Sequence, residues 1–296
     1  MEPKFVLTCC STSDHKPEFY ETKKIPYLMF HFRMNDTEYN DDLGQTISYK
    51  DFYQAIRDGA MPTTSQPSEG QYEDLWRPIL EEGKDILHVT LSSGLSGAIN
   101  SANATKDILE DKYPDRKIMI LDSLGASGGY GMLVEYLADL RDEGKTLEET
   151  YDWGQKNRLL LHHWFFSTDL TSYWRGGRIS RASAAFGNVL NICPLMNMDT
   201  EGHLHPRRNV RMKRRVIEEM VKEMENHVQN GHDYDGKCYL SESDCMADAE
   251  AVRKLVHEKF PKIKGEIGIS SVGTVIGAHT GPGTVALYFM GDMRTE

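Results

Sequence analysis

Two stretches of the chain repeat one pattern, in which an apolar run is followed by a turn of small residues and then by a helix. Residues 86–91 lead into Ser92-Ser93-Gly94-Leu95-Ser96-Gly97 and a helix expected over 98–109. Residues 117–121 lead through a Gly/Ser turn at 125–129 into a helix expected to end near Glu143. Strands that alternate with helices in this way form a parallel sheet, and ligands bind beyond the carboxyl ends of its strands. The first half is therefore predicted to be an α/β domain with its site at that edge.

The second half mixes strands and helices less regularly. Helices are expected over 213–229 and 247–260, a hairpin turn at 199–205, and strands over 163–167, 267–270, 272–276 and 285–289. The chain of 296 residues is long enough for two domains, which we place at 1–165 and 166–296. The predicted fold class is α/β, with an N-terminal parallel-sheet domain, a C-terminal α+β domain and the ligand at their interface.

The charge and the cysteine content of the chain argue against several classes of protein. The net charge of -11, from 45 acidic and 34 basic residues, argues against a general binder of nucleic acid or of anionic membranes, which needs a basic face. The five cysteines are odd in number and match neither a disulfide framework nor a zinc-site spacing. We see no signal peptide and no membrane span, so we expect a cytoplasmic protein without stable membrane insertion.

Two histidine pairs raise the question of a metal centre. These are His162 with His163, and His203 with His205. Two histidines do not make a metal site without further ligands, so both pairs are assigned to the surface, the second pair in a hairpin. No metal site is predicted.

Three loops combine small residues with hydrogen-bonding side chains. The glycines of 92–97 let backbone N–H groups approach an oxyanion at a helix N-terminus. Residues 61–68 contain two prolines and cannot be helical, so their hydroxyls and amide are expected on an extended loop. The segment His279-Thr280-Gly281-Pro282-Gly283 is expected in a loop after a strand over 272–276. These loops are the predicted binding elements.

One basic cluster stands out in this acidic chain. It consists of Arg207, Arg208, Arg211, Lys213, Arg214 and Arg215. Cations at the start of the helix expected over 213–229 oppose the helix dipole. We interpret this misplacement as a mark of an anion site rather than of a solvated helix start.

A serine hydrolase of acyl esters is the alternative from another class. Gly125-Ala126-Ser127-Gly128-Gly129 matches the G-x-S-x-G nucleophile pattern, with Asp169 and His279 downstream in hydrolase order. Ser127 or Ser96 would be the nucleophile and His279 the base. A turn that needs small residues gives the same match easily in a chain with 25 glycines, so we prefer a structural role. A small-anion binding module without an acyl tunnel is a third possibility.

Several of these segments, in this order, resemble the DegV family of bacterial fatty-acid-binding proteins. They are Thr64-Ser65-Gln66-Pro67-Ser68, residues 92–97, Gly176-Gly177-Arg178-Ile179-Ser180, Arg211 and residues 279–283, with further similarity at Asp122-Ser123 and 190–194. The resemblance covers nearly the whole chain. It implies two α/β domains that hold one long-chain fatty acid in a tunnel at their interface, in a carrier that is not an enzyme and has no cofactor.

The resemblance also implies which residues bind the ligand. Thr64 and Ser96 would hold the fatty acid carboxylate through their hydroxyls, and His279 would hydrogen-bond the same head group. Hydroxyl donors suit a carboxylate without a buried cation. Further candidates for this contact are Ser65, Ser93, Thr280 and Gly281.

A kinase partner follows from the same resemblance. Relatives present the bound acid to a separate fatty acid kinase, related to dihydroxyacetone kinases, which phosphorylates the carboxylate to an acyl phosphate. Arg178 and Arg211 match positions implicated in that presentation or in kinase docking. A guanidinium suits a phosphate because its fork binds two oxygens. The chain departs from the family at Cys10, where the usual residue is Asp, so the hydrogen bonds of that carboxylate are lost.

Overall fold

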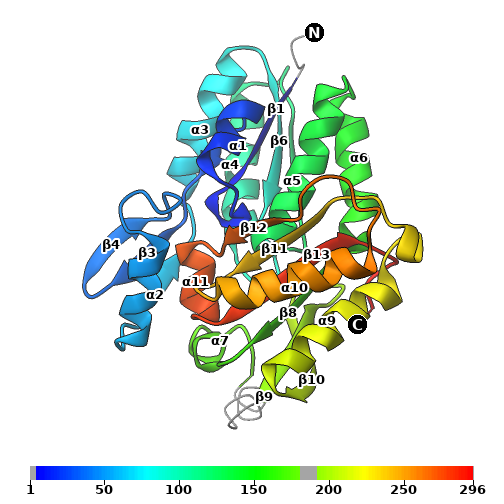
Figure 1. The fold of residues 1–296 in the computed structure, drawn as a ribbon. Helices are drawn as coiled ribbons and strands as arrows, with labels where there is room; N and C mark the ends of the chain where they lie inside the picture. Colours follow the sequence, from blue (N-terminus) through cyan, green and yellow to red (C-terminus); the bar gives the residue numbers. More distant parts are fainter. Residues whose placement is uncertain (1–4, 181–191, 296) are drawn as a thin grey trace.

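The computed structural model describes residues 5–180 and 192–295 (Figure 1). Its first half is built on a parallel sheet with the strand order β2-β1-β6-β7. The strands are β1 (Phe5–Cys10), β2 (Tyr27–Leu28), β6 (Asp85–Thr90) and β7 (Ile118–Asp122). All three pairings are parallel. Both predicted strand, turn and helix units are therefore confirmed, since β6 leads into α4 (Ala98–Lys112) and β7 into α5 (Ser127–Asp142).

Helices cover both faces of this parallel sheet. One face packs against α3 (Glu69–Glu81) and α4, and the other against α5 and α6 (Leu147–Asn157), as Figure 1 shows. Alternate residues of β6 face opposite sides, because Ile86 is buried with the α3 and α4 side chains and Leu87 with those of α5. The short helix α1 (Pro17–Lys23) follows β1.

The second half contains a mixed six-stranded sheet with the order β10-β9-β8-β13-β11-β12. Its strands are β8 (Leu161–Ser167), β9 (Ile192–Met198), β10 (Leu204–Arg211), β11 (Cys238–Glu242), β12 (Gly268–Ser271) and β13 (Thr284–Met290). Only the pairing of β11 with β12 is parallel among these described strands. The helices α9 (Lys213–His227) and α10 (Met246–Lys259) pack on this sheet. The predicted α+β second half and the hairpin at 199–205 are thus present.

The predicted domain boundary needs a correction. A division between residues 165 and 166 would cut β8, which pairs along its length with β13 in the six-stranded sheet. The topology therefore places the division just before Leu161.

The stretch 190–194, which contributes to the family resemblance, is described only in part. Residues 190 and 191 lie outside the described part of the chain, and residues 192–194 begin β9.

The helix α5 is shared by the two sheets, and small residues make this possible. Almost every residue of its first half is buried, because it packs on β1 and also on β8, β11 and β13. A Cβ at Gly128 would lie 2.6 Å from Ser241 Oγ, and one at Gly129 only 2.2 Å from His163 Nε2. The glycines of the G-x-S-x-G match therefore serve close packing of a helix on a sheet.

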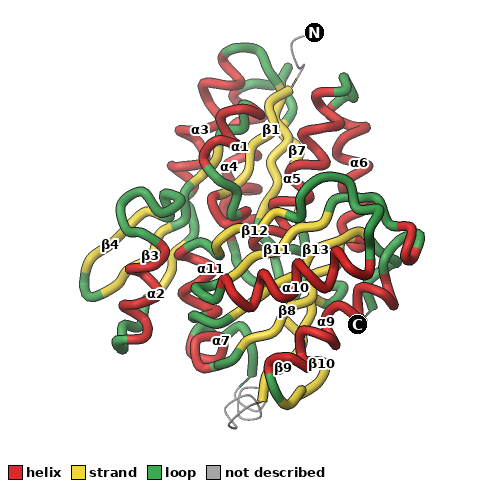
Figure 2. The backbone as a smooth tube through the Cα atoms, in the orientation of Figure 1, coloured by secondary structure: helices red, strands yellow, loops and turns green. Residues whose placement is uncertain are grey.

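A small antiparallel sheet projects beside the parallel one (Figure 2). It has the order β4-β3-β5 and consists of β3 (His31–Met34), β4 (Thr37–Asn40) and β5 (Thr63–Ser65), with α2 (Tyr49–Arg57) beside it. Two details differ from prediction. The apolar run 27–32 is divided between β2 and β3, and the extended loop 61–68 contains a paired strand, because β3 supplies a hydrogen-bonding edge for residues 63–65.

The segment 272–276 is not a strand, which corrects the prediction for the approach to His279. Residues 274–280 form α11 (Thr274–Thr280), so His279 and Thr280 are helical and Gly281, with a φ of 66°, follows as the cap. Val275 and Ala278, three residues apart, are both buried among the side chains around Phe52. The apolar residues Val272, Val275 and Ile276 lie in a segment too short to distinguish a buried strand from a buried helix, so periodicity alone could not separate the two.

The histidine pair of β8 is also placed differently from the prediction. His162 and His163 are buried, each only 3% exposed, because β8 lies inside the six-stranded sheet and is covered on both faces. His203 and His205, by contrast, are exposed around the β9–β10 hairpin, as expected. Of the helices that the structure describes, none combines the length and apolarity that crossing a bilayer requires.

Candidate functional site

A cavity of about 240 Å³ lies where the carboxyl ends of β6 and β7 face the six-stranded sheet. This is the edge of the parallel sheet at which the sequence predicts a site. Most of the lining is apolar and comes from both halves of the chain. The apolar lining residues are Phe30, Leu91, Leu95, Ala126, Phe165, Met198, Leu204, Val272, Val275, Ile276 and Ala286.

Thr64 and His279 meet at one end of this cavity. Thr64 is the middle residue of β5, and strand alternation turns its side chain inward while Thr63 and Ser65 are exposed. His279 Nε2 lies 2.8 Å from Thr64 Oγ1. Burial, and then the nearby charge of Arg178, lowers the pKa of His279 to about 4. The imidazole at the head of the cavity is therefore neutral at neutral pH.

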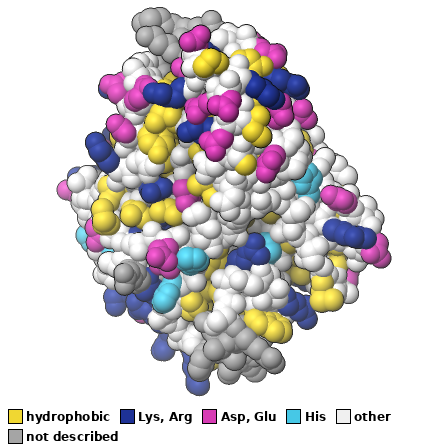
Figure 3. All heavy atoms as spheres, turned by 180° about the vertical axis from the view of Figure 1, so that it is seen from behind, with side chains coloured by type: hydrophobic (Ala, Val, Ile, Leu, Met, Phe, Trp, Pro, Cys, Tyr) yellow, Lys and Arg dark blue, Asp and Glu magenta, His cyan; other side chains and the backbone are white. Residues whose placement is uncertain are grey.

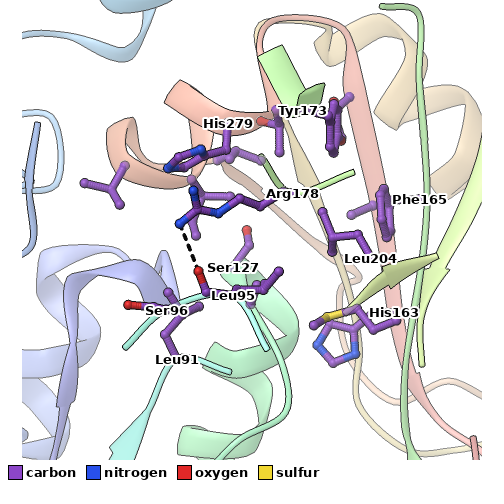
Figure 4. A pocket seen from close by; sticks show the side chains of 18 of the residues that line it. Leu91, Leu95, Ser96, Ser127, His163, Phe165, Tyr173, Arg178, Leu204 and His279 are labelled. Carbon is purple, nitrogen blue, oxygen red and sulfur yellow. Dashed lines mark hydrogen bonds between the residues drawn. The ribbon is translucent and has the colours of Figure 1, made fainter. Parts of the chain in front are cut away.

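Ser96 reaches the same end from the loop before α4 (Figure 4). Its hydroxyl accepts a hydrogen bond from Ala98 N at 3.2 Å and lies 3.4 Å from Gln66 Oε1. The sequence does not single out Gln66 as a site residue, although the two-residue period of an extended segment puts it on the side of Thr64. Gln66 thereby connects the segment that carries Thr64 to Ser96.

Arg178 joins the two halves of the chain at this end. Its Nη2 donates to Leu95 O at 2.9 Å, the dashed line in Figure 4, and its Nη1 donates to Gly176 O. A Cβ at position 176 would lie 2.1 Å from His279 Nδ1, so only glycine leaves room for the imidazole there. The half-buried guanidinium is thus held between the Ser96 loop and His279.

The remaining predicted residues are not all at the cavity. Thr280 lines it, whereas Ser65 and Ser93 are exposed and do not. Gly281 lines a second groove on the outer side of His279. Thr64, Arg178 and His279 line both the cavity and this outer groove. The polar end of the cavity is therefore also the floor of an outer groove.

The basic cluster lies apart from the cavity. Lys and Arg side chains gather along the lower edge of the face in Figure 3, and residues 211–215, from the end of β10 into α9, are all exposed. Several of the cations are paired, Arg208 with Glu219 and Glu223, Lys213 with Asp248, and Arg214 with Glu218. Arg211 lines neither the cavity nor the outer groove.

The serines proposed for a hydrolase are not arranged for nucleophilic catalysis. Ser127 lines the cavity, but its hydroxyl donates to Asp14 Oδ2 at 2.5 Å rather than to a histidine. The hydrogen bond of His279 Nε2 goes to Thr64, and the Asp169 carboxylate accepts from Thr171. The described residues therefore contain no serine, histidine and carboxylate relay of the kind that activates a nucleophile.

Two buried carboxylates hold the helix that carries His279. Asp41 accepts from Thr274 Oγ1 at 2.6 Å, and the Asp14 carboxylate lies against the backbone of Gly273, where an added Cβ would be 2.4 Å from Asp14 Oδ1. Burial, and then the charge of Asp41, raises the pKa of Asp14 well above its usual value. Burial likewise raises the pKa of Asp41. The pair fixes the start of α11 against the first half of the chain.

Asp41→Asn is expected to make the protein more stable at neutral pH, with an advantage that shrinks as the pH falls toward 4. A carboxyl whose pKa is higher in the folded chain binds more protons when folded, so the free energy of unfolding falls between the unfolded and folded pKa values as the pH rises. Asparagine does not ionise, so it avoids this loss of stability, which is about 1.4 kcal/mol for each unit by which the pKa is raised. It also keeps an oxygen that can accept the hydrogen bond from Thr274 Oγ1. Urea unfolding at pH 7 and pH 4 measures the difference. An equal loss of stability at both pH values would show that the charge does not matter.

Cys10 lies in the core beside this cluster. Its N–H donates to Tyr130 Oη at 3.0 Å, and its thiol is 3.9 Å from His88 Nε2. Burial raises the pKa of the thiol to about 12, so it stays neutral. A neutral thiol is compatible with the buried apolar side chains around Cys10, such as Leu28 and Phe30. Of the two acidic positions that the family usually has after the first strand, this chain keeps only Asp14.

Comparison with known proteins gives one consistent result. The family model described as an uncharacterised protein of the DegV family matches residues 4–292. A DegV domain-containing protein of Clostridium perfringens is 34% identical over 291 residues, which is 98% of this chain and 99% of that protein.

Solved structures share the fold over their whole length. The structure reported as fatty acid binding of a DegV family protein from Thermus thermophilus has a TM-score of 0.86 at 27% identity, over 97% of this chain and 99% of that one. The fatty acid kinase B3 protein of Streptococcus pneumoniae, loaded with linoleic acid, has a TM-score of 0.82 at 20% identity, over 98% and 100%. The two-domain α/β fold predicted from the sequence is therefore confirmed.

Proposed function

The chain belongs to the DegV family, and on this premise we propose that it binds one long-chain fatty acid in the cavity and presents the carboxylate to a fatty acid kinase. The observation that carries the proposal is the division of the cavity into one polar end and an apolar remainder drawn from both halves of the chain. Fatty acid binding by the Thermus thermophilus protein and the linoleic acid in the Streptococcus pneumoniae protein support it.

The acyl chain would supply most of the affinity. Burying a methylene group is worth about 0.8 kcal/mol, so a long chain gains on the order of 10 kcal/mol from apolar contact alone. The polar end would then set the orientation of the acid rather than its affinity.

The carboxylate would lie between the Thr64 and Ser96 hydroxyls. Each hydroxyl can donate one hydrogen bond to an oxygen of the acid. The neutral imidazole of His279 orients Thr64: if its Nε2–H donates to Thr64 Oγ1, the threonine hydrogen is free for the ligand. Arg178 adds a positive charge next to this position, because it lies close enough to affect His279.

The outer groove supports presentation to a kinase. It ends at Thr64, Arg178 and His279, so a carboxylate bound there would be reached from outside. Its rim exposes Met61 and Trp174, two large apolar side chains of a kind enriched in protein interfaces. We assign the docking of the kinase to this rim, and the exposed Arg211 to a contact of the docked partner.

The first test is native purification followed by organic extraction and mass spectrometry. One equivalent of a long-chain fatty acid should accompany the protein. A protein that emerges empty and does not bind added palmitic or oleic acid would contradict the proposal.

Thr64→Ala and Ser96→Ala are expected to lower acyl-phosphate formation by a partner kinase at least about tenfold while the fatty acid remains bound. Each lost hydrogen bond to a charged group is worth about 1.5–3 kcal/mol. Because the acyl chain supplies most of the affinity, this loss should disturb the orientation of the carboxylate rather than release the fatty acid. Ser65→Ala is the matched control, because this neighbouring hydroxyl is exposed and lies outside the cavity. Equal activity of all three variants would show that the hydroxyls do not orient the acid.

A further inference from the structure

Three side chains of types that can ligate a metal ion, from distant parts of the chain, converge on the face of the six-stranded sheet that lies away from α5. They are His162 in β8, His227 at the end of α9 and Asp292 after β13, and their ligand atoms all lie within 4.8 Å of one another. None of them lines the cavity or the outer groove. This cluster is therefore not explained by fatty acid binding.

The two imidazoles direct one nitrogen each at the same oxygen. His162 Nε2 and His227 Nδ1 both lie 3.1 Å from Asp292 Oδ1, and His162 Nε2 also lies 3.0 Å from the backbone oxygen of Asp292. The rings are stacked, with their centroids 5.0 Å apart and their planes at 22°. In a tetrahedral zinc site with bonds of about 2.0–2.1 Å, ligand atoms are about 3.3 Å apart. Small side-chain rotations would therefore place these three atoms around one ion.

The backbone already fixes the three segments against one another. Asp292 N donates to His227 O at 2.8 Å, and Gly291 N donates to Leu160 O at 2.7 Å. A Cβ at Gly291 would lie 2.5 Å from His227 O and 2.7 Å from His162 Cδ2, so only glycine allows this approach. The ligand positions are thus set by the fold rather than by flexible side chains alone.

The surroundings resemble the outer shell of a metal site. His227 Nε2 faces Glu223 Oε2 at 3.7 Å, and this carboxylate is buried and bound by Arg208 and Asn226. A carboxylate behind a ligating imidazole fixes its orientation and raises its basicity. Asp292 is 60% exposed at its side chain, so the open side of the cluster can take a water ligand. The charge of Arg294, which acts on His162, opposes a cation here, whereas Arg208 is paired with Glu219 and Glu223.

We propose that His162, His227 and Asp292 form a binding site for a divalent transition metal ion, with Zn²⁺ as the ion that their donor set fits best. Two imidazole nitrogens and one carboxylate oxygen with a water molecule are a donor set typical of zinc. The ion ties the C-terminal segment to β8 and α9, and its site is separate from the fatty acid cavity.

The test uses the full chain without a polyhistidine tag, stripped with a chelator and titrated with ZnCl₂ by calorimetry and with Co²⁺ by visible absorption. One saturable equivalent is expected, together with a rise in Tm on addition of Zn²⁺. His227→Ala and Asp292→Asn should each weaken binding by more than about 100-fold and remove the Tm response. The control His257→Ala, an exposed histidine on α10, should bind like the unaltered chain.

The Asp292→Asn variant separates a metal site from a hydrogen-bonded cluster. Asparagine keeps the oxygen that accepts from both imidazoles but is a poor zinc ligand. Because the side chain at position 292 is exposed, the variant is expected to fold like the unaltered chain. Absence of saturable Zn²⁺ binding by the unaltered chain would overturn the proposal. So would unchanged affinity in Asp292→Asn and His227→Ala.

Discussion

Ala286→Phe is expected to remove the bound fatty acid while the protein remains folded. Ala286 lies in β13, is only 6% exposed, and its side chain lines the cavity. A phenyl ring there would occupy space that the acyl chain needs. If it excludes about five methylene groups, the loss is about 4 kcal/mol, or about a thousandfold in affinity.

Two comparisons make this result specific. Ala251→Phe adds the same ring at an exposed position of α10 and should leave binding unchanged. Leu204→Trp enlarges a half-buried lining residue of β10 and should also weaken fatty acid binding. This second variant tests the same cavity if Ala286→Phe does not fold. Mass spectrometry of extracted lipid and a titration with a fluorescent fatty acid measure the effect. A full equivalent of fatty acid in both cavity variants would place the acyl chain elsewhere.

Gly129→Ala is expected to lower the free energy of unfolding by about 3 kcal/mol or more. The added Cβ would lie 2.2 Å from His163 Nε2 and 2.7 Å from Tyr288 Cδ1, and both of these side chains are buried in the six-stranded sheet. Neither side chain can swing into solvent, so α5 would have to move away from the sheet, and overpacking of this kind is costly.

The matched control for this prediction is Gly70→Ala in α3. A Cβ at position 70 meets only Ser68 Oγ, at 3.9 Å, and alanine favours the helix by up to about 1 kcal/mol. Urea unfolding of the two variants should therefore give changes of opposite sign. If Gly129→Ala is as stable as the unaltered chain, the glycines of this turn are not required for packing, and a role for Ser127 in chemistry would have to be reconsidered.

The alternatives raised by the sequence can now be compared with the geometry. The hydrolase interpretation depended on the small-residue turn around Ser127, and that turn is explained by the approach of α5 to the six-stranded sheet. In the described structure the hydroxyl of Ser127 is hydrogen-bonded to Asp14 and Ser241 and not to a histidine that could act as its base. A small-anion module would not need the apolar lining that surrounds the polar end of the cavity.

The sequence by itself determined the local elements of the first half. Each of the two units around β6 and β7 consists of an apolar run, a turn of small residues and a helix, and these signals lie within about 25 residues of one another. The same local reasoning predicted the helices α9 and α10. The family resemblance named Thr64, Ser96, Arg178, His279 and Thr280, and the structure brings all five to one cavity.

The tertiary structure alone decided which distant side chains meet. Thr64 and His279 are 215 residues apart, and Ser127 and Asp14 are 113 apart. His162, His227 and Asp292 likewise belong to three separate elements. Such contacts depend on the order of strands in a sheet and on the packing of α5 between two sheets, and hydrophobic periodicity records only which face of an element is buried, not what it faces. For the same reason the run 272–276 could be recognised as buried but not as the start of a helix.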